Sequence, residues 1–345
     1  MMAEQPEIVP LDDQVNQQLL EDHAGERTGW YVVGSQKYCF PSRYAAEAHN
    51  FLNIKTRKDD VWISTFPRSG TTLTQELVWM VMNDCDYEGA KRGLWERSPF
   101  LEVCLFFHPK TLEKFVRENE GNFERQKYIL GMSVPVYEYI DEMESPRVIK
   151  THFPPSLLPL DLDENGGKVI YMARNPKDVV ISYYHLLKLW RTSDYLNTFE
   201  HFVNQFINGH VPWGPFWSHV QEGWEKQHQE NYLFLFYEDV VKDLKGTIRS
   251  VAEFLNKPMD DEAVDKLADH LHISNFKKNP AVNFEDHKEI GILNKDGQGF
   301  IRQGKERGTS LEFSQELKQL VDDWIEEHYQ QTDLRFPVKQ SNGNA

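Results

Sequence analysis

The sequence predicts an α/β fold: a single domain with a mainly parallel central sheet flanked by helices. Short runs rich in β-branched and aromatic residues alternate with helical patterns along most of the chain. This alternation is typical of βαβ units, which build parallel sheets. The chain has 345 residues, 40% of them hydrophobic, which suffices for one large domain but is short for two.

Four segments have the length and the β-branched or aromatic content of buried strands. We expect helices after the first, third and fourth of them, and Leu73 and Leu77 fit one buried face of the first helix. Ligands in such folds bind beyond the carboxyl ends of the strands, so the segments that follow the strands are candidate sites. The predicted strands are residues 61–66, 147–150, 168–173 and 232–236, and the later helices run from about 178 to 190 and near 247–255.

The ends of the chain differ from the middle in composition. Residues 1–30 are polar, and we expect them to form a flexible N-terminal arm. The predicted domain covers residues 31–338, with no internal repeat and no linker rich in Gly, Ser or Pro. Residues 339–345 are expected to be a disordered tail.

Charge and cysteine content restrict the function. Acidic residues outnumber basic ones, 54 to 38, and the formal net charge is -16, so nucleic-acid binding is disfavoured. The cysteines Cys39, Cys85 and Cys104 are scattered, which indicates reduced thiols rather than disulfides or a metal site. Residues 1–14 lack an apolar leader and no stretch of about 18 apolar residues occurs, so we expect a cytoplasmic protein without membrane attachment.

The first candidate site is the P-loop-like strand–loop–helix element around residues 65–72 (TFPRSGTT). The start of a helix after a tight turn presents unpaired backbone N–H groups, which suit a phosphate. Arg68 adds a cation, and Thr71 and Thr72 add hydroxyl groups. The Walker A glycine and lysine are missing, and an ordinary turn capped by Ser69 and Thr71 remains the alternative.

The second candidate site follows the next predicted strand, at Lys150 and His152. These two side chains lie on the same side of an extended chain. A histidine can take a proton from a hydroxyl group near neutral pH, and a lysine can neutralise charge on a transferred group. A surface lysine beside a structural histidine is the alternative.

Two further segments carry cations. Arg174 ends the third predicted strand, and Ser182 lies about one turn into the next helix, so both can face an anion. A loop arginine with a helix-capping Asp178 is the plainer interpretation. The last segment is the glycine-containing loop at Arg302, Gln303 and Gly304.

Together and in this order, the four segments resemble the cytosolic sulfotransferase family. The similarity covers residues 55–336 and includes Tyr237-Glu238-Asp239 after the fourth strand. Four motifs in register are far more specific than one. The resemblance implies transfer of a sulfuryl group from 3′-phosphoadenosine 5′-phosphosulfate (PAPS) to the hydroxyl of a small lipophilic acceptor such as a phenol, steroid, retinoid or other alcohol. The product nucleotide is PAP, and no metal is required.

The resemblance also implies roles for individual residues. Lys150 and Arg68 would stabilise the transferred group, and His152 would act as the general base. The phosphosulfate loop and a second set of residues would hold the nucleotide, while aromatic residues would line the acceptor pocket. The cofactor-binding set is Arg68, Ser69, Gly70, Thr71, Thr72, Leu73, Arg174, Ser182, Tyr237, Leu271, Arg302, Gln303 and Gly304, and the substrate-binding set is Phe153, Trp213 and Phe216.

Several positions depart from the family pattern. Arg68 replaces the usual lysine, so it acts through its charge rather than as a proton donor. Leu73 replaces the usual tryptophan, and near Leu271 the usual small hydroxyl residue and the usual aromatic are absent. Adenine would therefore meet aliphatic side chains. Gln303 replaces a lysine. The usual dimer motif is not legible near residues 310–319, so the oligomeric state stays open.

Residues 85–139 form a longer stretch than is usual for the family. They carry Trp95, Phe100 and Phe115, and we expect an insertion near the acceptor site. It is either a lid over the pocket or a surface helix that buries these aromatics.

Other functions remain as alternatives. Insect retinol dehydratase resembles this family, so a lyase that acts through a transient sulfate ester is the main rival. A kinase is disfavoured because the Walker lysine is missing. A silent nucleotide-binding protein is disfavoured because Lys150 and His152 are both present.

Overall fold

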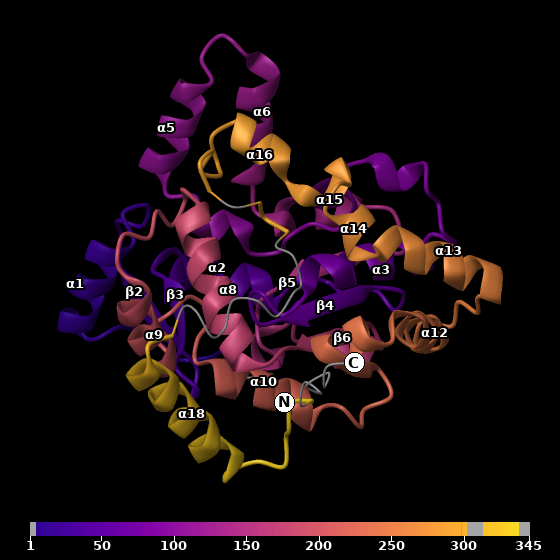
Figure 1. The fold of residues 1–345 in the computed structure, drawn as a ribbon. Coiled ribbons are helices and arrows are strands. Elements are labelled where there is room, and N and C mark those ends of the chain that lie inside the picture. The colour runs from indigo at the N-terminus through magenta and orange to yellow at the C-terminus, as the bar shows by residue number, and fades with distance from the viewer. Residues whose placement is uncertain (1–4, 298, 302–312, 338–345) are drawn as a thin grey trace.

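The computed structural model describes residues 5–297, 299–301 and 313–337 (Figure 1). Its central sheet has four parallel strands in the order β5-β4-β6-β7 with helices packed around them, which confirms the predicted α/β class. The strands are β4 (Val61–Thr65), β5 (Val148–Thr151), β6 (Lys168–Ala173) and β7 (Tyr232–Phe236).

Both faces of the sheet are covered, because successive side chains of a strand point to opposite faces. Ile63 of β4 packs among the helices of one layer, and its neighbour Trp62 packs in the larger hydrophobic cluster on the other face. Such burial on both sides explains why these strands read as continuous apolar runs. The first layer contains α3 (Thr71–Met82), α12 (Leu244–Phe254) and α13 (Asp261–Leu271), and the second contains α8 (Pro176–Leu189), α9 (Phe199–Ile207) and α10 (Phe216–Glu225).

The register aligns the carboxyl ends of the strands. Ile63 of β4 pairs with Lys150 of β5 and with Ile170 of β6, and Ala173 of β6 pairs with Phe236 of β7. The loops after all four strands therefore meet along one edge of the sheet.

The N-terminal segment is part of the folded body. A three-stranded antiparallel sheet joins β1 (Ile8–Pro10), β2 (Trp30–Val33) and β3 (Tyr38–Pro41), and α1 (Asp13–Asp22) lies beside it. Leu11, Leu19 and Trp30 are buried in one cluster. The expectation of a flexible arm over residues 1–30 is thus wrong for residues 5–30, because few but well-placed apolar side chains anchor a polar segment. Residues 1–4 and the predicted tail, 339–345, lie outside the described residues.

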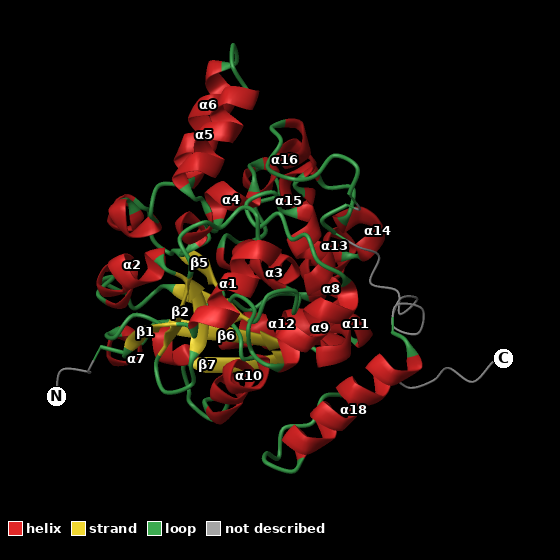
Figure 2. Ribbon diagram, turned by 90° about the vertical axis from the view of Figure 1, so that its left-hand side faces the viewer, coloured by secondary structure: helices red, strands yellow, loops and turns green. Residues whose placement is uncertain are grey.

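The predicted insertion, residues 85–139, forms several short helices. Its hairpin of α5 (Pro109–Glu118) and α6 (Phe123–Met132) stands out from the body of the molecule (Figures 1 and 2). The remaining helices are α2 (Arg43–Leu52), α4 (Leu94–Arg97), α7 (Leu162–Asn165), α11 (Tyr237–Lys242), α14 (Ile273–Phe276), α15 (Pro280–Asn283), α16 (Glu285–Glu289) and α18 (Gln315–Tyr329), with 3₁₀ helices at Gly89–Lys91, Val103–Phe106, Val136–Glu138, Ile140–Glu142 and Pro155–Leu157.

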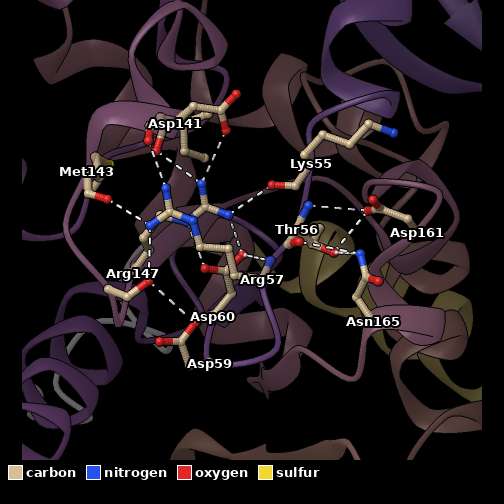
Figure 3. A network of polar contacts seen from close by, with 12 residues as sticks. Lys55, Thr56, Arg57, Asp59, Asp60, Asp141, Met143, Arg147, Asp161 and Asn165 are labelled. Atoms are coloured by element: carbon tan, nitrogen blue, oxygen red, sulfur yellow. Dashed lines mark hydrogen bonds and ion pairs between the residues drawn. The ribbon is translucent and has the colours of Figure 1, made fainter.

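A buried ion pair fixes the amino ends of β4 and β5 (Figure 3). The Arg147 guanidinium donates to both carboxylate oxygens of Asp60, at 2.7 and 2.6 Å, and both side chains are fully buried. Arg147 also donates to the carbonyl oxygens of Ile140 and Lys55. The backbone N–H of Arg57 also donates to Asp60, so both partners of the ion pair have additional hydrogen bonds. The pair lies at the amino ends of the strands, opposite the candidate site.

Among the described residues, no helix combines the length and the apolar character that crossing a membrane requires.

Candidate functional site

A cavity of about 990 Å³ is lined by the loops at the carboxyl ends of the strands. It brings together residues that the sequence places far apart, from the loop between β4 and α3 to α13. Among the predicted site residues, those that line it are Arg68, Gly70, Thr71, Thr72, Leu73, Lys150, His152, Arg174, Ser182, Trp213, Tyr237 and Leu271.

The loop between β4 and α3 is a tight turn with two left-handed residues. Arg68 has a φ of 71° and Gly70 a φ of 107°. A Cβ atom on Gly70 would lie 2.6 Å from Cδ2 of Tyr237, so glycine is required both by the backbone and by the close approach of this ring. The first residues of α3, Thr71, Thr72 and Leu73, line the cavity, so the start of this helix borders the space where an anion could bind.

Two hydroxyl residues of this loop, Ser69 and Thr71, are buried. Ser69 does not line the cavity and is fully buried, and its Oγ has no hydrogen-bond partner among the described residues. Thr71 contacts Thr65 through their hydroxyl groups at 2.7 Å. A buried hydroxyl without a partner is costly unless a ligand satisfies it, so the chemistry of this loop fits an anionic group.

Two arginines link the loop to neighbouring segments. Arg68 Nε donates to Ser182 Oγ at 2.9 Å, and Arg174 Nη1 donates to the carbonyl oxygen of Arg68 at 3.1 Å. The Arg174 guanidinium carbon lies 4.6 Å from the ring centroid of Tyr237. This arrangement places two cations, a hydroxyl and an aromatic ring around one volume, as a phosphorylated nucleotide requires.

Lys150 lies at the cavity wall against an aromatic ring. Its Nζ lies 3.5 Å from the ring centroid of Phe100, and burial lowers its pKa to about 7. The Glu102 carboxylate opposes this shift, and Arg68 adds to it. A lysine in this state is sensitive to any charge placed next to it.

The ring of His152 is oriented by the end of β4. Its Nδ1 lies 2.8 Å from the carbonyl oxygen of Thr65. Since a carbonyl only accepts, Nδ1 carries the proton, and Nε2 on the other side of the ring is the atom able to accept one. Burial, reinforced by the charge of Lys150, holds the pKa of His152 well below its usual value, so the ring is neutral.

Glu102 is a site residue that the sequence analysis missed. Its buried carboxylate accepts hydrogen bonds from Thr151 Oγ1 at 2.8 Å, the His152 backbone N–H at 2.7 Å and Trp213 Nε1 at 2.9 Å. Burial raises its pKa to about 7. Its place as the lone acid in the apolar run FLEVCLFF, residues 100–107, was the available signal, because a carboxylate in such a run is buried only with partners.

Glu102 and Phe100 reach the site because their segment extends the sheet. Lys150 donates its N–H to the carbonyl oxygen of Pro99, and Leu101 donates to the carbonyl oxygen of Lys150. Residues 99–101 of the predicted insertion therefore run beside β5.

The part of the cavity next to His152 is aromatic. Trp213 packs 5.1 Å from the ring of His152 and 4.4 Å from that of Phe106, measured between centroids. Residues 100, 103, 106 and 107 of the predicted insertion also line the cavity.

Two of the predicted substrate-binding residues belong to the core instead. Phe153 is fully buried against Phe40 and Phe51, and Phe216 is fully buried against Phe66. The assignment of Phe153 and Phe216 to the acceptor pocket is wrong, because the chain turns each side chain inward. Arg302, Gln303 and Gly304 lie outside the described residues.

The described residues contain no cluster of three or more His, Cys, Asp or Glu side chains suited to a metal ion.

Comparisons with known proteins agree with this geometry. The family model for a sulfotransferase domain matches residues 58–333. The chain is 32% identical over 309 residues to the luciferin sulfotransferase of Photinus pyralis, over 86% of this chain and 78% of that protein. It is 33% identical to the human sulfotransferase 1E1, over 83% of this chain and 89% of that one.

Solved structures give the same result. Retinol dehydratase in complex with retinol and PAP superposes with a TM-score of 0.88 at 34% identity, covering 96% of this chain and 99% of that one. A second structure of retinol dehydratase, with androsterone and PAP, matches with the same score and covers 98% of that chain. The family model, which covers most of the chain, and the curated relatives show that this chain belongs to the sulfotransferase family and is an enzyme that uses PAPS.

Proposed function

We propose that the chain transfers the sulfuryl group of PAPS to the hydroxyl of a small lipophilic acceptor, with His152 as the general base. The orientation of the imidazole carries this proposal. The Thr65 carbonyl oxygen holds the proton on Nδ1, which leaves Nε2 as a proton acceptor in a cavity-lining ring. Because the ring is neutral, it is ready to take the acceptor's proton without first losing its own.

The nucleotide supplies the activated sulfuryl group, and the chain supplies position and charge. Arg68, the N–H groups at the start of α3 and Thr72 would hold the phosphosulfate end. Arg174 and Ser182 would hold the second phosphate. The Lys150 ammonium would balance the negative charge that moves onto the leaving phosphate.

The lining of the cavity supports a lipophilic acceptor. The rings of Phe100, Phe106 and Trp213 surround the space next to His152. Relatives of known structure were solved with retinol and with androsterone, both of which carry one hydroxyl on a largely apolar skeleton. We infer the same class of acceptor here: a phenol, steroid, retinoid or other alcohol.

The test compares His152→Ala with the unchanged protein. Calorimetry with PAP measures nucleotide binding, and labelled PAPS with a panel of phenols, steroids and retinoids measures transfer. We expect unchanged PAP affinity and a loss of transfer of about 10²- to 10⁴-fold. Equal turnover by the variant and the unchanged protein would remove His152 from the role of base.

A lyase reaction is the second candidate, and the likeness to retinol dehydratase favours it. Transfer to an allylic alcohol first gives a sulfate ester. The C–O bond then breaks, sulfate leaves with the electron pair, and loss of a proton from carbon forms a new double bond. Accumulation of a stable retinyl sulfate would exclude this reaction, whereas inorganic sulfate with a dehydrated retinoid would establish it. The cytoplasmic location stays a prediction.

A further inference from the structure

The cavity contains a second polar region besides the one around His152. His23, Trp30 and Ser193 line the same cavity, but they contact one another and Tyr195. Figure 1 shows α1 and β2 at the left of the molecule beside α9, whereas β4 and β5 lie at its centre. The N-terminal segment thus supplies one wall of the cavity.

Hydrogen bonds and a close backbone contact hold this wall in place. The N–H of Gly25 donates to the carbonyl oxygen of Ser193 at 3.0 Å, and the carbonyl oxygen of Gly25 accepts from Thr111 Oγ1 at 3.1 Å. A Cβ atom on Gly25 would lie 1.9 Å from the carbonyl oxygen of Thr192, so the two backbones touch. Three segments far apart in sequence therefore fix the position of the His23 ring.

Two polar atoms in this wall are buried without a partner. His23 Nδ1 lies 2.8 Å from Ser193 Oγ, while His23 Nε2 and Trp30 Nε1 have no hydrogen-bond partner among the described residues. The two rings lie 5.1 Å apart, and each side chain is only 2% exposed. Leaving such atoms unsatisfied costs free energy, which a bound group would recover.

The chemistry of the two atoms defines what they would bind. The indole N–H only donates. Burial lowers the pKa of His23 to about 4, so its imidazole is neutral. With Ser193 on Nδ1, His23 Nε2 either donates or accepts. A carbonyl oxygen would accept from both rings, and a hydroxyl group would accept from Trp30 and donate to His23.

We propose that His23 and Trp30 form a distal polar subsite that binds a second oxygen atom of the acceptor. The subsite rests on the proposed function and assigns a substrate class to it. The substrates would be elongated apolar molecules with the reacting hydroxyl at one end and a carbonyl or hydroxyl at the other. Simple apolar alcohols fill the same cavity but leave the subsite unsatisfied.

The test uses two steroids that differ only at the far end. Androsterone carries a 3-hydroxyl and a 17-carbonyl group, and 5α-androstan-3α-ol carries the hydroxyl alone. Binding of each to the PAP-loaded protein is measured by calorimetry, and sulfation of each with labelled PAPS. We expect about tenfold tighter binding of androsterone, which corresponds to about 1.4 kcal/mol. The preference should appear in KM and not in kcat.

Two variants test the assignment to these rings. Trp30→Phe and His23→Phe should each reduce the preference to about twofold or less, with binding of the 3-hydroxy steroid and of PAP unchanged. Trp217→Phe is the matched control, because Trp217 Nε1 is also buried without a partner among the described residues, but Trp217 is not part of the cavity lining. It should keep the full preference. Thermal unfolding of each variant checks its fold.

The outcomes separate this proposal from the proposed function. Equal binding and sulfation of both steroids by the unchanged protein would overturn the subsite and leave the transferase assignment intact. A preference in binding without any sulfate product would support the subsite and contradict the acceptor chemistry. Binding of neither steroid would overturn the subsite, while sulfation of a phenol or retinoid from the panel would still support the transferase assignment.

Discussion

The Glu102 carboxylate accepts a hydrogen bond from the backbone N–H of His152 at 2.7 Å. The group that holds the end of β5 therefore comes from the segment that pairs with this strand, at Phe100 and Lys150. The same carboxylate lies close enough to Lys150 for each charge to shift the pKa of the other. One buried acid therefore influences both Lys150, which we propose to act on the transferred group, and His152, the proposed base. It acts through them, as a positioning residue, rather than on the acceptor.

The first prediction concerns Glu102→Gln. The amide still accepts hydrogen bonds, but the negative charge next to Lys150 is lost. Because Glu102 raises the pKa of Lys150, its removal lowers that pKa further. Lys150 then loses its proton at lower pH, and the basic limb of the pH profile of kcat/KM for PAPS moves down by about one unit or more.

Thr151→Val is the control for this experiment. It removes one hydrogen bond to Glu102 but keeps the charge, so the basic limb should stay near its original position. A Glu102→Gln profile that superposes on that of the unchanged protein would show that Glu102 has only a structural role.

The second prediction concerns Gly70, the glycine of the turn between β4 and α3. Gly70→Ala places a Cβ atom at 2.6 Å from Tyr237 on a backbone with a φ of 107°. The left-handed conformation alone costs about 1–2 kcal/mol, and relief of the contact must move either the turn or the ring. We expect PAP affinity, measured by calorimetry, to fall by about tenfold or more.

Gly121→Ala is the matched control. Gly121 has a φ of 87°, but a Cβ atom there would meet nothing within 4 Å. This variant should lose stability by a similar backbone cost and keep its PAP affinity. If Gly70→Ala bound PAP as well as Gly121→Ala does, the contact with Tyr237 would not matter for the nucleotide site.

The central sheet could be predicted because its strands are buried on both faces. Such strands are continuous apolar runs, and the bounds of β6 and β7 coincide with the predicted segments. Helix α8 starts two residues before the predicted position. Asn175 caps it by accepting from the Lys177 N–H, and Pro176 occupies the first turn, so the Asn-Pro pair was a readable start signal.

The N-terminal segment could not be predicted in the same way. Its helix α1 has a largely polar sequence, and the segment is held by pairing with distant residues, as between His23 and Tyr195, which are 172 positions apart. Neither partner shows a local signal for this contact. Only the tertiary fold reveals that the segment closes one wall of the cavity.

The candidate site was predictable where a residue directly follows a strand. Lys150, His152 and Arg174 all line the cavity, because the carboxyl ends of parallel strands share one edge. Phe153 and Phe216 were assigned wrongly, since the direction of a side chain beyond a strand end depends on packing rather than on sequence spacing.

The third prediction separates stability from function. Arg147→Met removes one partner of the buried pair with Asp60 and leaves a carboxylate without its counter-charge. Breaking a buried pair in this way costs about 3–5 kcal/mol, so the free energy of unfolding in urea should fall by that amount. Arg125→Met breaks the exposed pair with Glu289 and should cost less than about 1 kcal/mol. Because Arg147 lies at the amino end of β5, the folded variant should bind PAP with unchanged affinity, and a weaker affinity at a temperature where it is fully folded would mean that the two ends of the sheet are coupled.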